Sequence, residues 1–170
     1  MLRWLVNGEL KGVRSPGGHW RVDESALPTQ SEGHENPLVP VEDELHVAII
    51  EDDASQAAAL ARLVGMFAPT ASIHLASDGL MAGLVLGSAR PHVAFVDIEM
   101  PGLDGIEVVR RARKVASLQR TRFVVLSGRL TQERVDALAE IGVLDVFRKP
   151  IPPDILRAIL DAAAAAIARQ

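Results

Sequence analysis

Cysteine and long apolar stretches are both absent from this chain of 170 residues. Without cysteine the protein has no disulfides and no thiolate metal sites, and such a composition fits a reducing compartment. No stretch approaches the roughly 18 consecutive apolar residues that a membrane-spanning helix requires, and the first residues lack the pattern of a secretory leader. We therefore expect a cytoplasmic protein that does not associate with membranes.

Positive charge is missing from residues 23–44, which carry seven acidic residues and no lysine or arginine. Residues 1–22 carry four basic residues against one acidic residue, whereas residues 45–170 carry 14 charges of each sign. Residues 28–44 also hold three prolines and show little apolar periodicity. This distribution predicts a small basic segment over residues 1–27, an acidic linker over residues 28–44 and a folded domain over residues 45–170.

Short apolar runs alternate with longer helical patterns from residue 45 onward. The runs are HVAIIE, ASIHLA, HVAFVD, RFVVLS and LDVFRK, and a helical pattern follows each one. Five strand-then-helix units predict an α/β domain with a parallel sheet, because right-handed crossovers lay helices on both of its faces. In such doubly wound sheets, ligands bind beyond the carboxyl ends of the strands.

Polar side chains follow four of the predicted strands: Glu51 and Asp52, then Asp97, Ser127 and Lys149. Because parallel strands end at one edge of the sheet, we expect these side chains to converge. Three neighbouring carboxylates would raise one another's pKa unless a cation neutralised them. Oxygen ligands without cysteine favour a hard octahedral ion, and Mg²⁺ is the natural candidate beside a phosphate.

The remaining polar groups suit phosphoryl chemistry. The hydroxyl of Ser127 and the charge of Lys149 can bind the oxygens of a phosphoryl group. Asp97 would then be the nucleophile and form an aspartyl phosphate. We expect Pro101, Gly102 and Gly105 to turn the chain sharply after Asp97 and so keep the pocket open to a phosphoryl donor.

Residues 45–170 resemble the receiver domain of two-component response regulators. The matching motifs are the acidic pair Glu51–Asp52, Asp97 in DIEMPGLDG, Ser127, and Lys149 followed by Pro150, at spacings of 45, 30 and 22 residues from Asp52 onward. The resemblance implies a flavodoxin-like (βα)5 fold with strand order 2-1-3-4-5. It also implies that a sensor histidine kinase or a phosphotransfer protein phosphorylates Asp97 with the help of Mg²⁺.

The resemblance also implies finer details of the site. Mg²⁺ would be bound by Asp52, Asp97 and the backbone carbonyl of Glu99, with Glu51 acting mostly through water, and the peptide bond before Pro150 would be cis. Glu99 and Arg129 lie at positions that tune dephosphorylation in the family, and Gly128 would leave room for the donor. The sequence departs from the family at Val146, where an aromatic switch residue is common, although Phe147 lies beside it.

The N-terminal stretch RSPGGHWRV resembles the wing of MerR-type winged helix-turn-helix proteins, with two short β-like pieces around Pro16–Gly18. That resemblance implies DNA contacts by Arg14, His19 and Arg21. The first helix and the start of the recognition helix would precede Met1. Three explanations stay open: a translation start further upstream, a vestige of the motif, or packing of this segment against another chain.

Several residues have simpler interpretations. Asp53 is expected to cap the first helix. His46, His74 and His92 are expected to be packing or edge residues rather than metal ligands. The Ala162–Ala166 run is expected to form the end of the last helix, and its small side chains leave a homodimer open.

Two functions compete for the whole chain: a DNA-binding transcriptional regulator and a stand-alone receiver that acts through protein contacts. Neither is a dedicated enzyme. A haloacid-dehalogenase-like phosphohydrolase is the third alternative, but its DxDx[TV] motif does not follow the first strand.

Overall fold

The computed structural model describes residues 44–100 and 104–169 in full, and residues 12–14 and 20–22 by their backbone. The chain divides into two compact units, Met1–Asn36 and Pro37–Gln170. No helix in these described ranges is long and apolar enough to cross a membrane.

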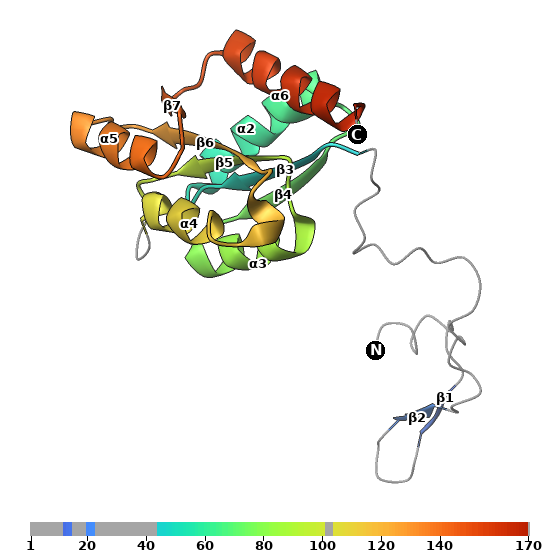
Figure 1. The fold of residues 1–170 in the computed structure, drawn as a ribbon. Helices are drawn as coiled ribbons and strands as arrows, with labels where there is room; N and C mark the ends of the chain where they lie inside the picture. Colours follow the sequence, from blue (N-terminus) through green and yellow to red (C-terminus); the bar gives the residue numbers. More distant parts are fainter. Residues whose placement is uncertain (1–11, 15–19, 23–43, 101–103, 170) are drawn as a thin grey trace. The chain divides into compact units, whose positions relative to one another are not determined.

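The larger unit is built on a parallel sheet (Figure 1). Its strands are β3 (His46–Ile50), β4 (Ser72–Ala76), β5 (Val93–Asp97), β6 (Arg122–Ser127) and β7 (Asp145–Arg148). They lie in the order β4-β3-β5-β6-β7, and every neighbouring pair is parallel. This is the predicted order 2-1-3-4-5, so the flavodoxin-like fold is confirmed.

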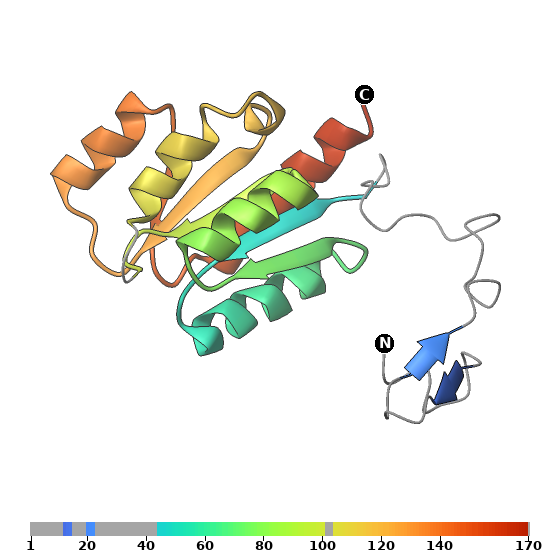
Figure 2. The ribbon, with the colours of Figure 1, turned by 90° about the horizontal axis from the view of Figure 1, so that it is seen from below.

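Helices cover both faces of this sheet (Figures 1 and 2). They are α2 (Ala54–Phe67), α3 (Gly79–Ala89), α4 (Gly105–Ala112), α5 (Gln132–Glu140) and α6 (Pro153–Ile167), with a short 3₁₀ helix η2 (Ala116–Leu118) before β6. Helices α2 and α6 share one apolar core with one face of the sheet, whereas α3, α4 and α5 share the other. The Ala162–Ala166 run forms the end of α6 as expected, while a homodimer through it stays a prediction.

The central strands are apolar on both faces, as a doubly covered sheet requires. In β3, Val47 and Ile49 pack toward α2 and α6, and Ala48 and Ile50 pack toward α3 and α4. Every residue of β3 and of β5 is buried. Asp97, the last residue of β5, and Glu51, which follows β3 directly, are therefore held in fixed positions by buried strands.

Side-chain caps begin four of the helices. Asp53 accepts hydrogen bonds from the backbone of Ser55 and Gln56 at 2.8 and 3.0 Å, which confirms its predicted role as the cap of α2. The remaining caps are Asp78 for α3, Asp104 for α4 and Thr131 for α5. Such caps satisfy backbone N–H groups that have no partner within the helix.

Gly105 has a role different from the one expected of it. It is the first residue of α4, and a Cβ there would lie 2.1 Å from the carbonyl oxygen of Asp97. Glycine is thus required because the helix begins directly against the end of β5. Pro101 and Gly102, which were expected to share in a turn, lie outside the described residues.

The smaller unit contains an antiparallel pair, β1 (Gly12–Arg14) with β2 (Trp20–Val22). Arg14 is paired with Trp20 and Val13 with Arg21. These are the two β-like pieces anticipated around Pro16–Gly18. His19 and the expected recognition helix lie outside the described residues.

Candidate functional site

Three acidic residues converge at the carboxyl ends of β3 and β5. Carboxylate oxygens of Glu51, Asp52 and Asp97 all lie within 4.8 Å of one another. Glu51 and Asp97 are each 5% exposed, whereas Asp52 is exposed to solvent. Burial of two carboxylates so close together is costly unless positive charge compensates them.

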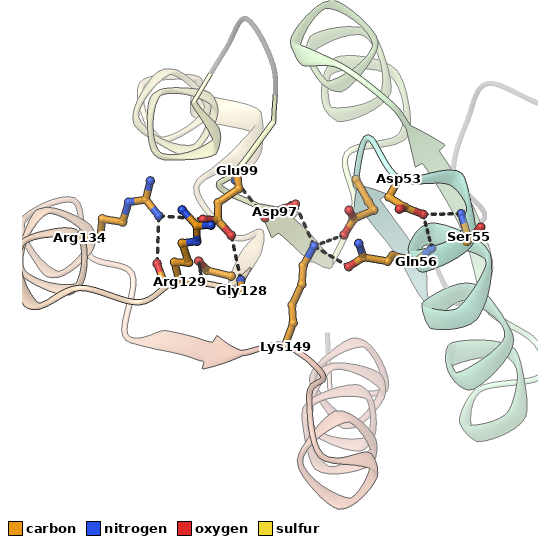
Figure 3. Close-up of polar contacts among 11 residues, drawn as sticks. Asp53, Ser55, Gln56, Asp97, Glu99, Gly128, Arg129, Arg134 and Lys149 are labelled. Atoms are coloured by element: carbon orange, nitrogen blue, oxygen red, sulfur yellow. Dashed lines mark hydrogen bonds and ion pairs between the residues drawn. The ribbon is translucent and has the colours of Figure 1, made fainter.

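Lys149 supplies positive charge at this point (Figure 3). It follows β7, and its Nζ donates to Asp97 Oδ2 at 2.8 Å and to Glu51 Oε2 at 2.5 Å. The same nitrogen donates to Gln56 Oε1 at 3.1 Å. One ammonium therefore joins two strand ends and the first turn of α2.

The pKa values of Glu51 and Lys149 are shifted by burial and by the charges of their neighbours. Burial raises the pKa of Glu51 above its ordinary value of 4.5, although the hydrogen bond and charge of Lys149 act in the opposite direction. Burial acts to lower the pKa of Lys149, but Asp97 and Glu51 outweigh it, and that pKa lies above its ordinary 10.5. Lys149 is thus a permanent cation, and Glu51 depends on it to remain an anion.

Lys149 is also held through its backbone. Its N–H donates to the carbonyl of Ser127 at 2.9 Å, and the Lys149–Pro150 peptide bond is cis, as the resemblance implied. The strand pairing therefore places Lys149 and Ser127 next to each other at the same edge of the sheet.

Ser127 ends β6 and is fully buried. It follows Leu126, which is the register partner of Asp97 in the neighbouring strand. Its Oγ accepts a hydrogen bond from the backbone N–H of Arg129 at 3.0 Å. The hydroxyl hydrogen is not needed for that bond, so Ser127 can still donate to an acceptor.

Glu99 connects the loop after β5 with the loop after β6. Its backbone N–H donates to Asp97 Oδ1 at 3.0 Å, which orients that carboxylate. Its side chain accepts from the N–H of Gly128 at 3.1 Å and from Arg134 at 3.3 Å (Figure 3). The carboxylate of Glu99 therefore does not belong to the acidic group of Glu51, Asp52 and Asp97, and only its backbone carbonyl remains a predicted metal ligand.

The acidic group has the chemistry that Mg²⁺ requires. All its donors are carboxylate oxygens, which hard divalent cations prefer. Glu51 Oε1 is buried and has no hydrogen-bond partner within the described residues, so a cation near it would satisfy an otherwise unpaired group. These residues fit the ion that the sequence predicted.

Val146, at the position where the family often has an aromatic residue, and its neighbour Phe147 point to opposite faces of the sheet. Val146 packs against the core shared with α3, α4 and α5, whereas Phe147 packs against the core shared with α2 and α6. Phe147 therefore does not replace an aromatic ring at position 146. Position 146 holds the smaller valine side chain, on the face of the sheet shared with α3, α4 and α5.

Sequence reasoning missed two residues of the site. Gln56 and Arg134 are both polar residues in the first turn of a helix, three residues after its capping residue. Their position in a capping turn offered a weak signal, but only the packing of these turns beside β5 and β6 brings them to the site. Of the predicted DNA contacts, Arg14 and Arg21 are described by backbone alone in the smaller unit, and His19 lies outside the described residues.

Comparisons with known proteins agree with this geometry. Residues 47–161 match the family described as the response regulator receiver domain. The chain is 33% identical over 116 residues to the transcriptional regulatory protein CseB of Streptomyces coelicolor, covering 67% of this chain and 47% of that protein. It is 31% identical over 109 residues to a protein-glutamate methylesterase/protein-glutamine glutaminase of Burkholderia thailandensis, covering 63% of this chain and 30% of that protein.

Solved structures show the same fold. The receiver domain of a DNA-binding response regulator (merR) from Colwellia psychrerythraea superimposes with a TM-score of 0.68 at 25% identity, over 72% of this chain and 99% of that one. A CheY-like receiver domain from Methanospirillum hungatei has a TM-score of 0.66 at 15% identity, over 74% of this chain and 98% of that one. The chain spans less than half the length of the two curated relatives named above. This chain belongs to the response regulator receiver domain family.

Proposed function

We propose that this protein is a phosphorylation-controlled switch in which Asp97 accepts a phosphoryl group from a sensor histidine kinase or a phosphotransfer protein. The observation that carries the proposal is the contact of Asp97 Oδ2 with Lys149 Nζ at 2.8 Å, beside two further carboxylates. A nucleophilic carboxylate, a fixed cation and an acidic metal site are the parts that phosphoryl transfer requires.

The transfer follows from the roles of these groups. A carboxylate oxygen of Asp97 attacks phosphorus, the P–N bond of a phosphohistidine breaks, and the imidazole leaves with the bonding electrons and takes up a proton. Lys149 and the hydroxyl of Ser127 then bind the new phosphoryl oxygens. Mg²⁺ held by Glu51, Asp52 and Asp97, with the Glu99 carbonyl, would supply positive charge against these oxygens.

The charges around Asp97 make the modified state different from the resting one. In the resting state, Lys149 forms ion pairs with both Asp97 and Glu51. A dianionic phosphoryl group on Asp97 competes for that ammonium and for the hydroxyl of Ser127. Since Ser127 is bonded to the loop at Arg129, a shift of its side chain changes the loop after β6.

A partner surface adjoins the site. An apolar groove of about 310 Å³ lies between α2 and the chain after β7, and Glu51, Gln56 and Lys149 form one end of it. Its apolar lining includes Leu60, Leu63 and Ile151. A protein that presents a phosphohistidine can bury apolar side chains here while the phosphoryl group reaches Asp97.

Acetyl phosphate labelling tests the proposal. With Mg²⁺, the full chain should gain one phosphoryl group in its intact mass, and Asp97→Asn should abolish this gain. Asp161→Asn is the matched control, since Asp161 is an exposed aspartate of α6 whose ion pair with Arg157 is 3.6 Å long. Labelling of Asp97→Asn at the level of the control would reject Asp97 as the acceptor.

A second candidate function is transcriptional regulation through DNA. It is favoured by the antiparallel pairing of β1 with β2, which is the form of a wing, and by relatives named as transcriptional or DNA-binding regulators. Arg14, His19 and Arg21 would contact the phosphate backbone. Binding of the full chain to duplex DNA, measured by fluorescence anisotropy, should weaken in Arg14→Ala. Affinity that is absent, or unchanged in this variant, would leave the receiver switch as the function.

A further inference from the structure

A second cavity lies at the amino ends of the strands, at the end of the sheet opposite Asp97. It has a volume of about 400 Å³. Its walls come from the residues just before β5 and β6, from η2 and from the last turns of α6. These segments take no part in the phosphorylation site.

Basic residues line this cavity, and no carboxylate does. Arg122 is held in a bidentate pair with Asp145 at 2.7 and 3.0 Å, so its charge is largely balanced. Arg120 also has a partner within the fold. Arg90 differs from both: its backbone N–H donates to the carbonyl of Leu86 at 3.2 Å, but its guanidinium makes no hydrogen bond or ion pair with any described residue. Among the residues that the structure describes, the guanidinium of Arg90 is therefore left without a partner in this cavity.

His92 adds a directed donor to the same cavity. Its Nδ1 accepts a hydrogen bond from the backbone N–H of His46 at 3.0 Å. The neutral ring must therefore carry its hydrogen on Nε2, and that atom has no partner among the described residues. Ser117 contributes a hydroxyl to the lining. The cavity offers several hydrogen-bond donors without an acidic acceptor.

The backbone of Arg90 is unusual. It ends α3 with φ at 44°, and within the described ranges it is the one non-glycine residue with a positive φ. Glycine is favoured at such helix ends because a Cβ is strained in the left-handed conformation. No described contact of the arginine side chain offsets this strain. An arginine at a position where glycine would be unstrained favours a role for its guanidinium in binding.

We propose that this cavity is a binding site for a small phosphomonoester. Its phosphate would be bound by Arg90, His92 and Ser117, and its apolar body would lie on Ala163, Ala166 and Ile167 of α6. A phosphate is favoured over a carboxylate because its three terminal oxygens accept more hydrogen bonds from a donor-rich site. This site is separate from the proposed phosphorylation of Asp97 and does not depend on it.

The proposal can be tested by NMR titration of the full chain with phenyl phosphate, without Mg²⁺ so that Asp97 is not modified. Amide signals around residues 90–92 and 117–121 should shift in a saturable manner. Benzoate and inorganic phosphate, which lack the phosphate and the apolar body respectively, should bind more weakly.

Arg90→Gly separates binding from folding. Glycine relieves the positive φ, so the melting temperature should not fall, whereas the affinity for phenyl phosphate should drop about tenfold or more through loss of a charged hydrogen bond. Arg62→Ala is the control, since Arg62 is an exposed arginine of α2 outside the cavity.

Three results would overturn the assignment. The first is the absence of saturable shifts at residues 90–92. The second is an Arg90→Gly variant that binds as tightly as the wild type, or an Arg62→Ala control that loses as much affinity. The third is benzoate or inorganic phosphate binding as tightly as phenyl phosphate.

Discussion

Lys149 Nζ lies 2.8 Å from Asp97 Oδ2 and contacts Glu51 Oε2 at the same time. A single cation thus holds together two buried carboxylates that come from different strands. This relationship explains how the site can stay folded before any metal or phosphoryl group arrives. It also means that the residue proposed to bind the phosphoryl group supports the resting structure.

Removal of this cation should destabilise the domain. Lys149→Met leaves Glu51 and Asp97 facing each other while buried, and we expect a loss of about 3–5 kcal/mol in the free energy of unfolding measured in EDTA. Mg²⁺ should restore more stability to this variant than to the wild type, because the ion replaces the lost charge. Urea unfolding in EDTA and in Mg²⁺ measures both effects.

Lys114→Met is the control for that experiment, since Lys114 is an exposed residue after α4. Equal stability of Lys149→Met and Lys114→Met in EDTA would contradict a structural role for the cation.

Two glycines should respond in opposite ways to substitution by alanine. Gly105→Ala places a Cβ 2.1 Å from the Asp97 carbonyl oxygen and should cost about 2–3 kcal/mol of stability. Gly83→Ala, within α3, meets nothing within 4 Å and should stabilise the domain by about 0.5–1 kcal/mol. Thermal unfolding of the two variants compares them, and similar effects would argue against the close approach of α4 to β5.

Stability should fall on mild acidification because of the histidines at the amino ends of the strands. The pKa values of His74 and His92 both lie below the ordinary 6.5. Burial is the larger cause, and the neighbouring His46 is the second. A histidine with a lowered folded pKa binds its proton more readily in the unfolded chain. Its stabilising contribution is therefore complete above the unfolded value and is lost as the pH falls from there toward the folded pKa.

His74→Gln should reduce this pH dependence. His74 Nε2 lies 3.1 Å from His46 Nδ1, and the two rings are stacked with centroids 5.4 Å apart, so protonation of the His74 ring is disfavoured. Urea unfolding between about pH 7.5 and 5.5 should show a smaller loss of stability in the variant than in the wild type. Parallel pH profiles for the two proteins would refute this explanation.

Glu99 should stabilise the loop after β6 against local opening. Glu99→Ala removes the acceptor for the N–H of Gly128 and the partner of Arg134, so the Gly128 amide should exchange with solvent faster. The effect on global stability should stay below about 1 kcal/mol, because this pair is partly exposed. Hydrogen exchange by NMR measures the amide, with Glu133→Ala in α5 as the control. An unchanged exchange rate at Gly128 would remove Glu99 from this role.

The fold was predictable because its signals are local. Alternation of short apolar runs with helical patterns depends on neighbouring residues, and each strand and helix of the larger unit appeared where that alternation indicated. One difference is at α4, where the helical pattern DGIEVVRRARKV extends to Val115 while the helix ends at Ala112. Lys114 and Val115 instead belong to turns that lead into η2.

The acidic group was predictable for a related reason. Parallel strands end at one edge of the sheet, so Glu51, Asp52 and Asp97 were expected to meet, as they do. Glu99 illustrates the limit of this reasoning. Its place near Asp97 was evident, but the direction of its side chain, toward Gly128 and Arg134, depends on the loop after β6.

The amino-acid sequence by itself determined the alternation of strands and helices, the cap Asp53 and the set of polar residues at the strand ends, because periodicity and spacing are properties of the chain alone. The order of the strands in the sheet was implied by the resemblance to the receiver family. Only the tertiary structure decided which of those residues contact one another. Lys149 joins Asp97, Glu51 and Gln56 across as many as 98 residues of sequence, because hydrogen bonds form between side chains that packing brings together. Arg90 lines a cavity with α6 because the same packing places the end of α3 beside the end of α6.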